Sequence, residues 1–114
     1  MTDNRLSELL EHIRGETRNA MQFVDGMDKS AFLANALVQR AVTMCLINIG
    51  EEATKIMDRY AAFAEAHPEV PWHRIRGMRN QIAHGYFDLD LDAIWTTTQT
   101  DLPALLERLP AAAE

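Results

Sequence analysis

The chain lacks the features that mark several classes of protein. A single cysteine among 114 residues cannot form a disulfide within the chain. No apolar run approaches the roughly 18 residues that span a bilayer, and the polar start MTDNRLSELLEH has no apolar signal-peptide core. We therefore expect a soluble, cytoplasmic protein with no membrane partner.

Glycine and proline are also scarce, with Gly 5 and Pro 4, whereas residues that favour helices are plentiful. The composition is that of an ordinary globular protein, 47% hydrophobic and 25% charged. A chain of this length falls within the usual size of one domain. The sequence therefore predicts an all-α fold in a single domain over residues 1–114, with a frayed tail from about residue 110.

Motifs for metal, nucleotide and covalent chemistry are missing as well. The four histidines do not have a metal-ligand spacing, and the Glu-x-x-His pair of di-iron bundles does not occur. Neither a glycine-rich phosphate loop nor a nucleophile elbow is present. Cys45 lies in the apolar run 41–49, which favours a core cysteine over a thiolate nucleophile. We expect no metal and no cofactor.

Four segments repeat apolar residues at steps of three and four, the period of amphipathic helices. Capping and turn residues place them at about 2–25, 28–66, 71–85 and 88–109. We expect the second to bend near Asn35, and Asp88 or Asp90 to cap the fourth. Pro103 must kink or interrupt that fourth segment. Together the segments predict a four-helix up-and-down bundle.

The second segment carries two apolar stripes, which implies two buried sides. One stripe extends from Val38 to Phe63; the other contains Leu33, Leu37, Ala41, Met44 and Ile47. In a chain this small, the second side has no obvious partner within the chain over residues 37–49. We therefore predict a homodimer contact there. The alternative is that the segment is simply the central helix of the bundle.

A basic stretch stands out in this acidic chain. Residues 72–86, WHRIRGMRNQIAHGY, hold three arginines and two histidines and no acid, although the net charge is −6. The overall charge argues against a general, charge-driven binder of DNA or membranes. The local excess of positive charge leaves room for a small anion-binding site.

The basic stretch has two different sides when it is placed on a helix. The core side holds the apolar residues Ile75, Met78 and Ile82. The opposite ridge holds Arg76, Asn80 and His84, with His73 next to Arg76.

Arg79 falls at the margin of the apolar sector, where a guanidinium is costly unless it finds a partner. Glu51 or Glu52, in the middle of the long second segment, could anchor it. In that case Arg79 forms a structural salt bridge. Otherwise Arg79 is available to bind a phosphate. Helical geometry alone leaves both possibilities open.

His84 lies in the last turn before Gly85. The helix dipole favours the imidazolium form at such a position, and histidine titrates near neutral pH. Alone, His84 would be a capping or surface residue. With Arg79 and Asn80 on the same short helix, it becomes a candidate general acid or base beside a phosphate-binding fork and a neutral hydrogen-bonding group. Spacing alone predicts that Tyr86 is an aromatic at the rim of the core.

The string GMRNQIAHGYFDLDLDAIW, preceded by NIGEEATKI and HPEVPW and followed by TTTQTDLPALLERL, resembles the HepT-like branch of the HEPN superfamily. The resemblance covers nearly the whole chain. Its motif is an arginine, four residues and a histidine, with a tyrosine two positions further on. Arg79, His84 and Tyr86 match these positions.

The resemblance implies a small, all-helical, homodimeric toxin that cuts RNA without a metal. Arg79 and His84 would be the catalytic pair, with Asn80 as the polar residue beside the arginine. In such families the residues of both protomers meet in one cleft at the dimer axis. Tyr86 would be the residue on which a cognate minimal nucleotidyltransferase antitoxin places AMP groups to silence the toxin.

RNA cleavage through the 2′-hydroxyl needs a base, an acid and positive charge on the phosphorane. A dimer would supply all three, and Arg74, Arg76 and His73 would add RNA contacts. Arg79 and His84 are five residues apart, which separates them by about 140° around a straight helix. We therefore expect the second protomer to complete the site.

Two alternatives stay open. A non-catalytic dimeric HEPN module would use its basic groove to bind a nucleotide or the partner transferase. A structural bundle would hold Arg79 with Glu51 or Glu52, and replacing Arg79 would then only destabilise the fold.

Overall fold

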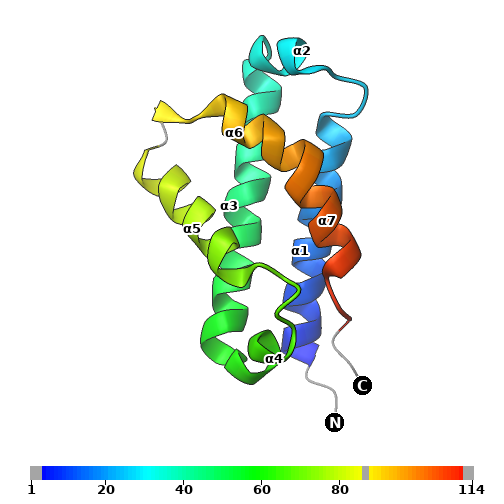
Figure 1. Ribbon diagram of the computed structural model, residues 1–114, viewed down its shortest axis with the longest axis vertical. Helices are drawn as coiled ribbons and strands as arrows, with labels where there is room; N and C mark the ends of the chain where they lie inside the picture. The colour runs from blue at the N-terminus through cyan, green and yellow to red at the C-terminus, as the bar shows by residue number, and fades with distance from the viewer. Residues whose placement is uncertain (1–3, 86–87, 112–114) are drawn as a thin grey trace.

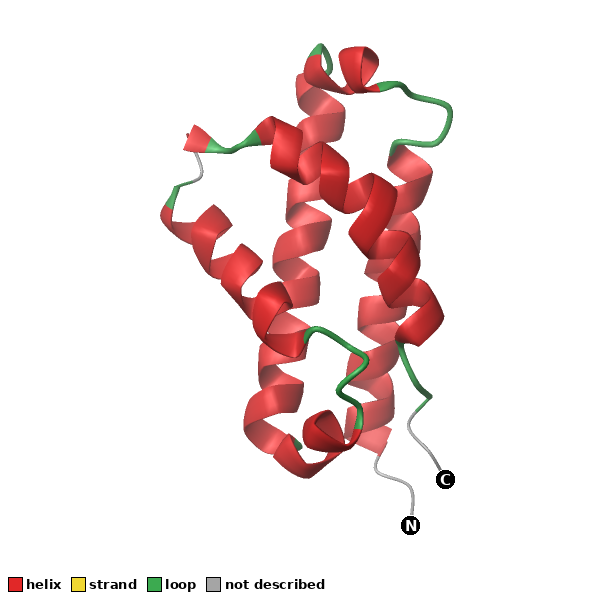
Figure 2. Cartoon of the chain, viewed as in Figure 1, coloured by secondary structure: helices red, strands yellow, loops and turns green. Residues whose placement is uncertain are grey.

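The computed structural model describes residues 4–85 and 88–111. Every regular element within these residues is helical, and no strand occurs among them (Figure 2). The elements are α1 (Asn4–Phe23), α2 (Lys29–Leu33), α3 (Ala36–Arg59), α4 (Ala61–Ala66), α5 (Trp72–His84), α6 (Leu91–Thr96), the π-helical turn η2 (Thr97–Asp101) and α7 (Leu102–Arg108). The predicted all-α class is confirmed.

Helices α1 and α3 pack side by side and form the spine of the fold (Figure 1). Their apolar faces meet in the core, where Leu10, Ile13 and Val42 have no exposed surface. Burying such a side chain stabilises the folded state by about 1.5–3 kcal/mol. Thr17 is equally buried, because its hydroxyl donates a hydrogen bond to the Ile13 carbonyl oxygen at 2.7 Å. A satisfied hydroxyl thus continues the core of α1 between the buried residues Ile13 and Ala20.

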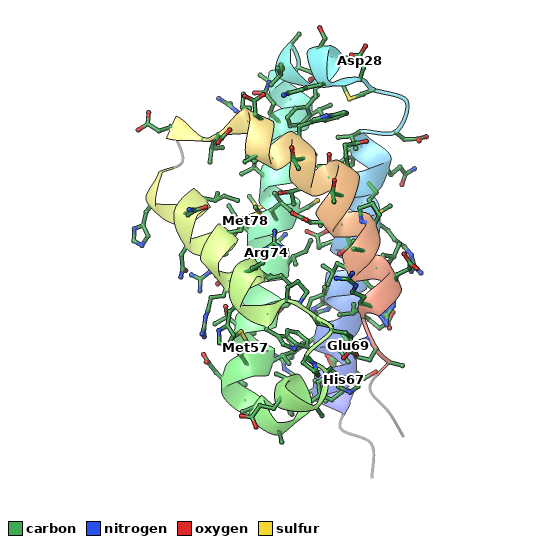
Figure 3. The ribbon with its side chains drawn as sticks, viewed as in Figure 1. Asp28, Met57, His67, Glu69, Arg74 and Met78 are labelled. Carbon is green, nitrogen blue, oxygen red and sulfur yellow. The ribbon has the colours of Figure 1, made fainter. Side chains whose placement is uncertain are left out.

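The predicted second segment consists of three helices. Its bend near Asn35 is confirmed: the Asn35 side chain caps α3 by accepting a hydrogen bond from the Val38 amide at 3.0 Å. Asp28, labelled in Figure 3, caps α2 in the same way through the Ala31 amide at 2.8 Å. Such caps satisfy amides that a helix start would otherwise leave open. The second break, at Tyr60, was not predicted, and nothing in the sequence explains it.

The predicted fourth segment begins at Asp90, whose side chain accepts a hydrogen bond from the Ala93 amide at 3.1 Å. The π-helical turn η2 interrupts it shortly before Pro103. Proline has no amide hydrogen to give to an interior helical bond, and a π turn changes the bonding pattern at this point. The predicted interruption is confirmed. At the end of the segment, the Pro110 carbonyl accepts a hydrogen bond from Arg14 in α1 at 3.3 Å.

The third predicted segment, α5, begins at Trp72, one residue after Pro71, and ends before Gly85. It packs on α3, and its carboxyl end diverges from α7 (Figure 1). The four-helix up-and-down arrangement and the homodimer stay predictions. No helix among the described residues is both long and apolar enough to cross a membrane.

Cys45 is a core residue of α3, as predicted. Burial, together with the nearby charge of Glu16, raises the pKa of the Cys45 thiol to about 11. A thiol with that pKa carries almost no thiolate near neutral pH. Cys45 therefore contributes to packing and is no nucleophile.

Candidate active site on α5

Trp72 anchors the start of α5. Its indole is buried, and Nε1 donates hydrogen bonds to the carbonyl oxygens of Ala64 and His67, both at 3.1 Å. The predicted core side of the helix is confirmed, because it packs against the core through Ile75, Met78 and Ile82. These contacts fix the rotation of α5 about its own axis, and with it the direction of every polar side chain on the helix.

Gly50 allows α5 to approach α3 closely. A side-chain carbon at position 50 would come within 2.7 Å of Arg79 Cγ and closer still to its Cβ, and would lie 3.4 Å from the Ile75 carbonyl oxygen. Closely packed interiors do not accommodate such overlap. The stem of Arg79 therefore lies directly on the α3 backbone. This role of Gly50 was not predicted from the sequence, although a lone glycine within a helical pattern is a known sign of close packing.

The guanidinium of Arg79 lies beside Glu51 of α3. Arg79 Nε is 3.0 Å from Glu51 Oε1, and Nη2 donates a hydrogen bond to Thr54 Oγ1 at 3.5 Å. Nε is shielded from water, yet its N–H is not aligned for a hydrogen bond, so attraction between the charges holds this contact. Of the two predicted anchors, Glu51 is therefore the partner. The Arg79 side chain keeps 25% of its surface exposed, so its remaining N–H groups can reach an anion.

Glu52 is engaged elsewhere, in the seam between α1 and α3. Its Oε1 lies 2.9 Å from His12 Nδ1 and its Oε2 lies 3.2 Å from Lys55 Nζ. Burial alone would raise the pKa of Glu52, but hydrogen bonds and charge from His12 and Lys55 outweigh burial and lower it. Glu52 is thus a charged partner of those two residues.

The other two arginines of α5 also face carboxylates, on different sides of the helix. Arg74 lies 3.6 Å from Asp101 of η2. Arg76 lies 3.7 Å from Asp58 of α3 and 3.4 Å from His73 Nδ1. The structure therefore brings two of the predicted RNA-contacting residues, Arg76 and His73, together and turns Arg74 away from them. With a carboxylate beside each arginine, α5 is less positive than its own sequence indicates.

His84 and Asn80 lie on the exposed side of α5. His84 is the last residue of the helix, which Gly85 caps. Among the described residues, neither side chain forms a hydrogen bond or ion pair with Arg79 or with any other group. Tyr86, the predicted modification site, lies outside the described residues. Among the described residues, no hydrogen bond or ion pair therefore joins Arg79 to His84, and their pairing stays a prediction.

In the part of the chain that the structure describes, two pockets found beside α5 are not lined by Arg79 or His84. One lies between α3, α5 and the η2–α7 region, where Arg74 and Met78 contribute to its walls (Figure 3). The other lies beside α3 and α4 and includes Met57. Because these hollows do not coincide with the predicted pair, neither of them is the catalytic cleft of a single copy.

An exposed apolar strip on α3 leads to the Arg79 contact. Leu37 is 79% exposed and Met44 is 56% exposed. Glu51 follows Met44 by seven residues, as Met44 follows Leu37, and residues seven apart return to almost the same side of a helix. The strip and the Glu51–Arg79 pair therefore share one face of α3.

The sequence that forms this site also matches a known protein family. Residues 13–112 match the family described as Ribonuclease HepT-like. The chain belongs to this family. The match includes the second half of α1, all of α3 and α5, and the elements that follow, so the expected HepT-like resemblance is confirmed.

Several curated relatives are similar to this HepT-like chain. A "Putative RNase" of Caldanaerobacter subterraneus subsp. tengcongensis is 33% identical over 96 residues, which cover 84% of this chain and 83% of that protein. A "Probable ribonuclease HepT" of Thermococcus cleftensis is 36% identical over 74 residues, covering 65% and 64% respectively. A "Putative RNase" of Methanocaldococcus jannaschii is 29% identical over 105 residues, covering 92% and 94%. No solved structure shows a significant match.

Proposed function

We propose that this chain is a metal-independent endoribonuclease and the toxin of a toxin–antitoxin pair. The observation that carries the proposal is the placement of Arg79. Its stem is packed on Gly50, and its charged group is partly open at the end of the apolar strip formed by Leu37 and Met44. The names of the curated relatives support RNA as the substrate.

The exposed groups of α5 supply the chemistry of cleavage through the 2′-hydroxyl. A His84 imidazole accepts the proton of the 2′-hydroxyl while its oxygen forms a bond to phosphorus. A second His84, protonated, gives a proton to the 5′-oxygen as the bond from phosphorus to that oxygen breaks. Arg79 stabilises the negative charge of the phosphorane, and Asn80 orients the reacting groups. The products are a 2′,3′-cyclic phosphate and a 5′-hydroxyl.

A homodimer brings these groups together. A two-fold axis at the strip would cover Leu37 and Met44 of each copy with the same residues of the other, as in an isologous contact. Because Glu51 lies on the same face of α3 and contacts Arg79 of α5, the two α5 helices would then lie near the axis. His84 of one copy could reach the phosphate bound by Arg79 of the other, which resolves their separation of about 140° on a single helix.

Other basic residues would extend the site along the RNA. Arg76 and His73 lie together on α5 and are placed to contact its backbone. Arg74, which faces Asp101, would meet RNA only on the opposite side of the helix.

The antitoxin would inhibit RNA cleavage by modifying Tyr86, two residues after His84 in the sequence. An AMP group on Tyr86 would add a negative phosphodiester and considerable bulk next to the site, which would repel RNA and obstruct entry. The proposed partner is a cognate minimal nucleotidyltransferase, and the proposed location of both proteins is the cytoplasm.

One experiment tests this function in two arms. Purified protein is incubated with RNA in excess EDTA, and the products are examined by mass spectrometry, with cyclic phosphate ends expected. In the second arm, the protein is co-expressed with the cognate minimal nucleotidyltransferase, and we expect a mass increase in AMP steps together with loss of cleavage. Intact RNA in the first arm, despite binding of RNA or nucleotide, would favour the non-catalytic module.

A further inference from the structure

The structure holds Arg79 in place from α3, and three residues within about one turn of that helix take part. Gly50 removes the side chain that would collide with the stem of Arg79. Glu51 faces Nε at 3.0 Å, and Thr54 accepts a hydrogen bond from Nη2 at 3.5 Å. We infer that Gly50, Glu51 and Thr54 form a cradle in which Glu51 is a positioning residue for Arg79; this inference rests on the proposed function.

The contacts of the cradle leave part of the guanidinium open. A guanidinium has five N–H donors in a rigid plane. Glu51 lies at Nε and Thr54 at Nη2, whereas none of the described residues accepts a hydrogen bond from Nη1. The cradle therefore occupies Nε and one N–H of Nη2. It leaves both N–H groups of Nη1 and the second N–H of Nη2 for a phosphate. A planar fork fixed in this way loses less freedom on binding than a free arginine would.

Thr54 is itself held in the orientation that this contact requires. Its hydroxyl donates a hydrogen bond to the Gly50 carbonyl oxygen at 2.8 Å. The hydroxyl hydrogen is thus used, and the lone pairs of Thr54 Oγ1 remain to accept from Arg79. The same turn of α3 that makes room for the arginine stem also orients its second partner.

A purely structural role for Glu51 fits the geometry less well. Half of the Glu51 side chain is exposed, and ion pairs of this kind contribute little to stability because water screens them. The spine is held by the buried apolar residues of α1 and α3. Removing the charge of Glu51 should therefore leave the fold unchanged and release the guanidinium.

The neighbouring glutamate provides a matched control. Glu51→Gln and Glu52→Gln make the same chemical change at adjacent positions, but Glu52 contacts His12 and Lys55 instead of Arg79. The rate of RNA cleavage in EDTA is measured for both variants, with thermal unfolding of each. We expect Glu51→Gln to lower kcat by about tenfold to a hundredfold, as a misplaced catalytic group does, with KM and unfolding close to those of the parent protein. Glu52→Gln should keep the parent kcat.

A double-mutant comparison separates positioning from other effects. If Glu51 acts through Arg79, adding Glu51→Gln to an Arg79→Ala variant should lower the residual rate no further. If Glu51→Gln has the parent kcat or a higher one, the positioning role is wrong. The proposed function still stands in that case, provided that Arg79→Ala keeps only a small residual rate. Full cleavage by Arg79→Ala would overturn both.

Discussion

Alanine in place of His84 or Arg79 is expected to lower the rate of RNA cleavage at least about a hundredfold and to leave the fold intact. Loss of a general acid or base lowers a rate by about a hundredfold to ten-thousandfold. Loss of a group that stabilises developing charge costs about a hundredfold to a thousandfold. His84 is exposed and forms no hydrogen bond among the described residues, and Arg79 loses only a partly exposed ion pair. The measurements are the cleavage rate in EDTA and the free energy of unfolding.

Matched controls exist on α1. His12 and Arg18 are exposed residues of the same two types, remote in sequence from α5. His12→Ala and Arg18→Ala should cleave RNA at the parent rate. Each catalytic variant should lose no more than about 1 kcal/mol of stability, the upper range for such surface contacts. Cleavage at the parent rate by both His84→Ala and Arg79→Ala would remove the basis for the proposed site.

The second large effect is expected at the apolar strip. Replacing Leu37 and Met44 together by glutamate should convert the protein to a monomer and reduce cleavage at least about a hundredfold, because each copy then lacks the catalytic groups of the other. The two glutamates of each copy would face those of the other copy across the two-fold contact and repel them. Burying these charges without a partner is also unfavourable. Both side chains are largely exposed in the single chain, so its own fold should survive. Light scattering gives the mass, and the EDTA assay gives the rate.

The control for this variant adds the same charge elsewhere. Gln22→Glu with Ala62→Glu places two glutamates at exposed positions of the α1 end and of α4. That variant should stay dimeric and active. A Leu37→Glu, Met44→Glu protein that remains a dimer with parent activity would show that the two copies associate through another surface.

Sequence periodicity predicted the helices well where capping residues and apolar steps agree. Asn35 and Asp90 cap the helices that their positions suggested, and the core side of α5 is the predicted one. These features depend on neighbours within a few residues, which a sequence displays directly. The motif also identified Arg79 and His84 as candidates.

Features that depend on distant residues were not predictable from periodicity. The choice of Glu51 over Glu52 follows from the rotation of α3 relative to α5, and the close approach at Gly50 follows from how the two helices cross. The pairing of Arg74 with Asp101 likewise joins segments that the sequence separates. The burial of Thr17 was not predictable either, because its hydroxyl is satisfied only once the helix has formed. The packing of the helices against one another determines which of these residues come into contact.

The most direct test of a site shared by two copies is the dependence of cleavage on the fraction of inactive subunits. Parent protein and His84→Ala protein are mixed in equal amounts, exchange of subunits is verified by native mass spectrometry, and the rate in EDTA is measured. If both His84 residues serve one cleft, only parent homodimers cleave, and the rate falls to about one quarter of that of an all-parent sample. A fall to about one half, as expected when each copy cleaves independently, would contradict the shared site.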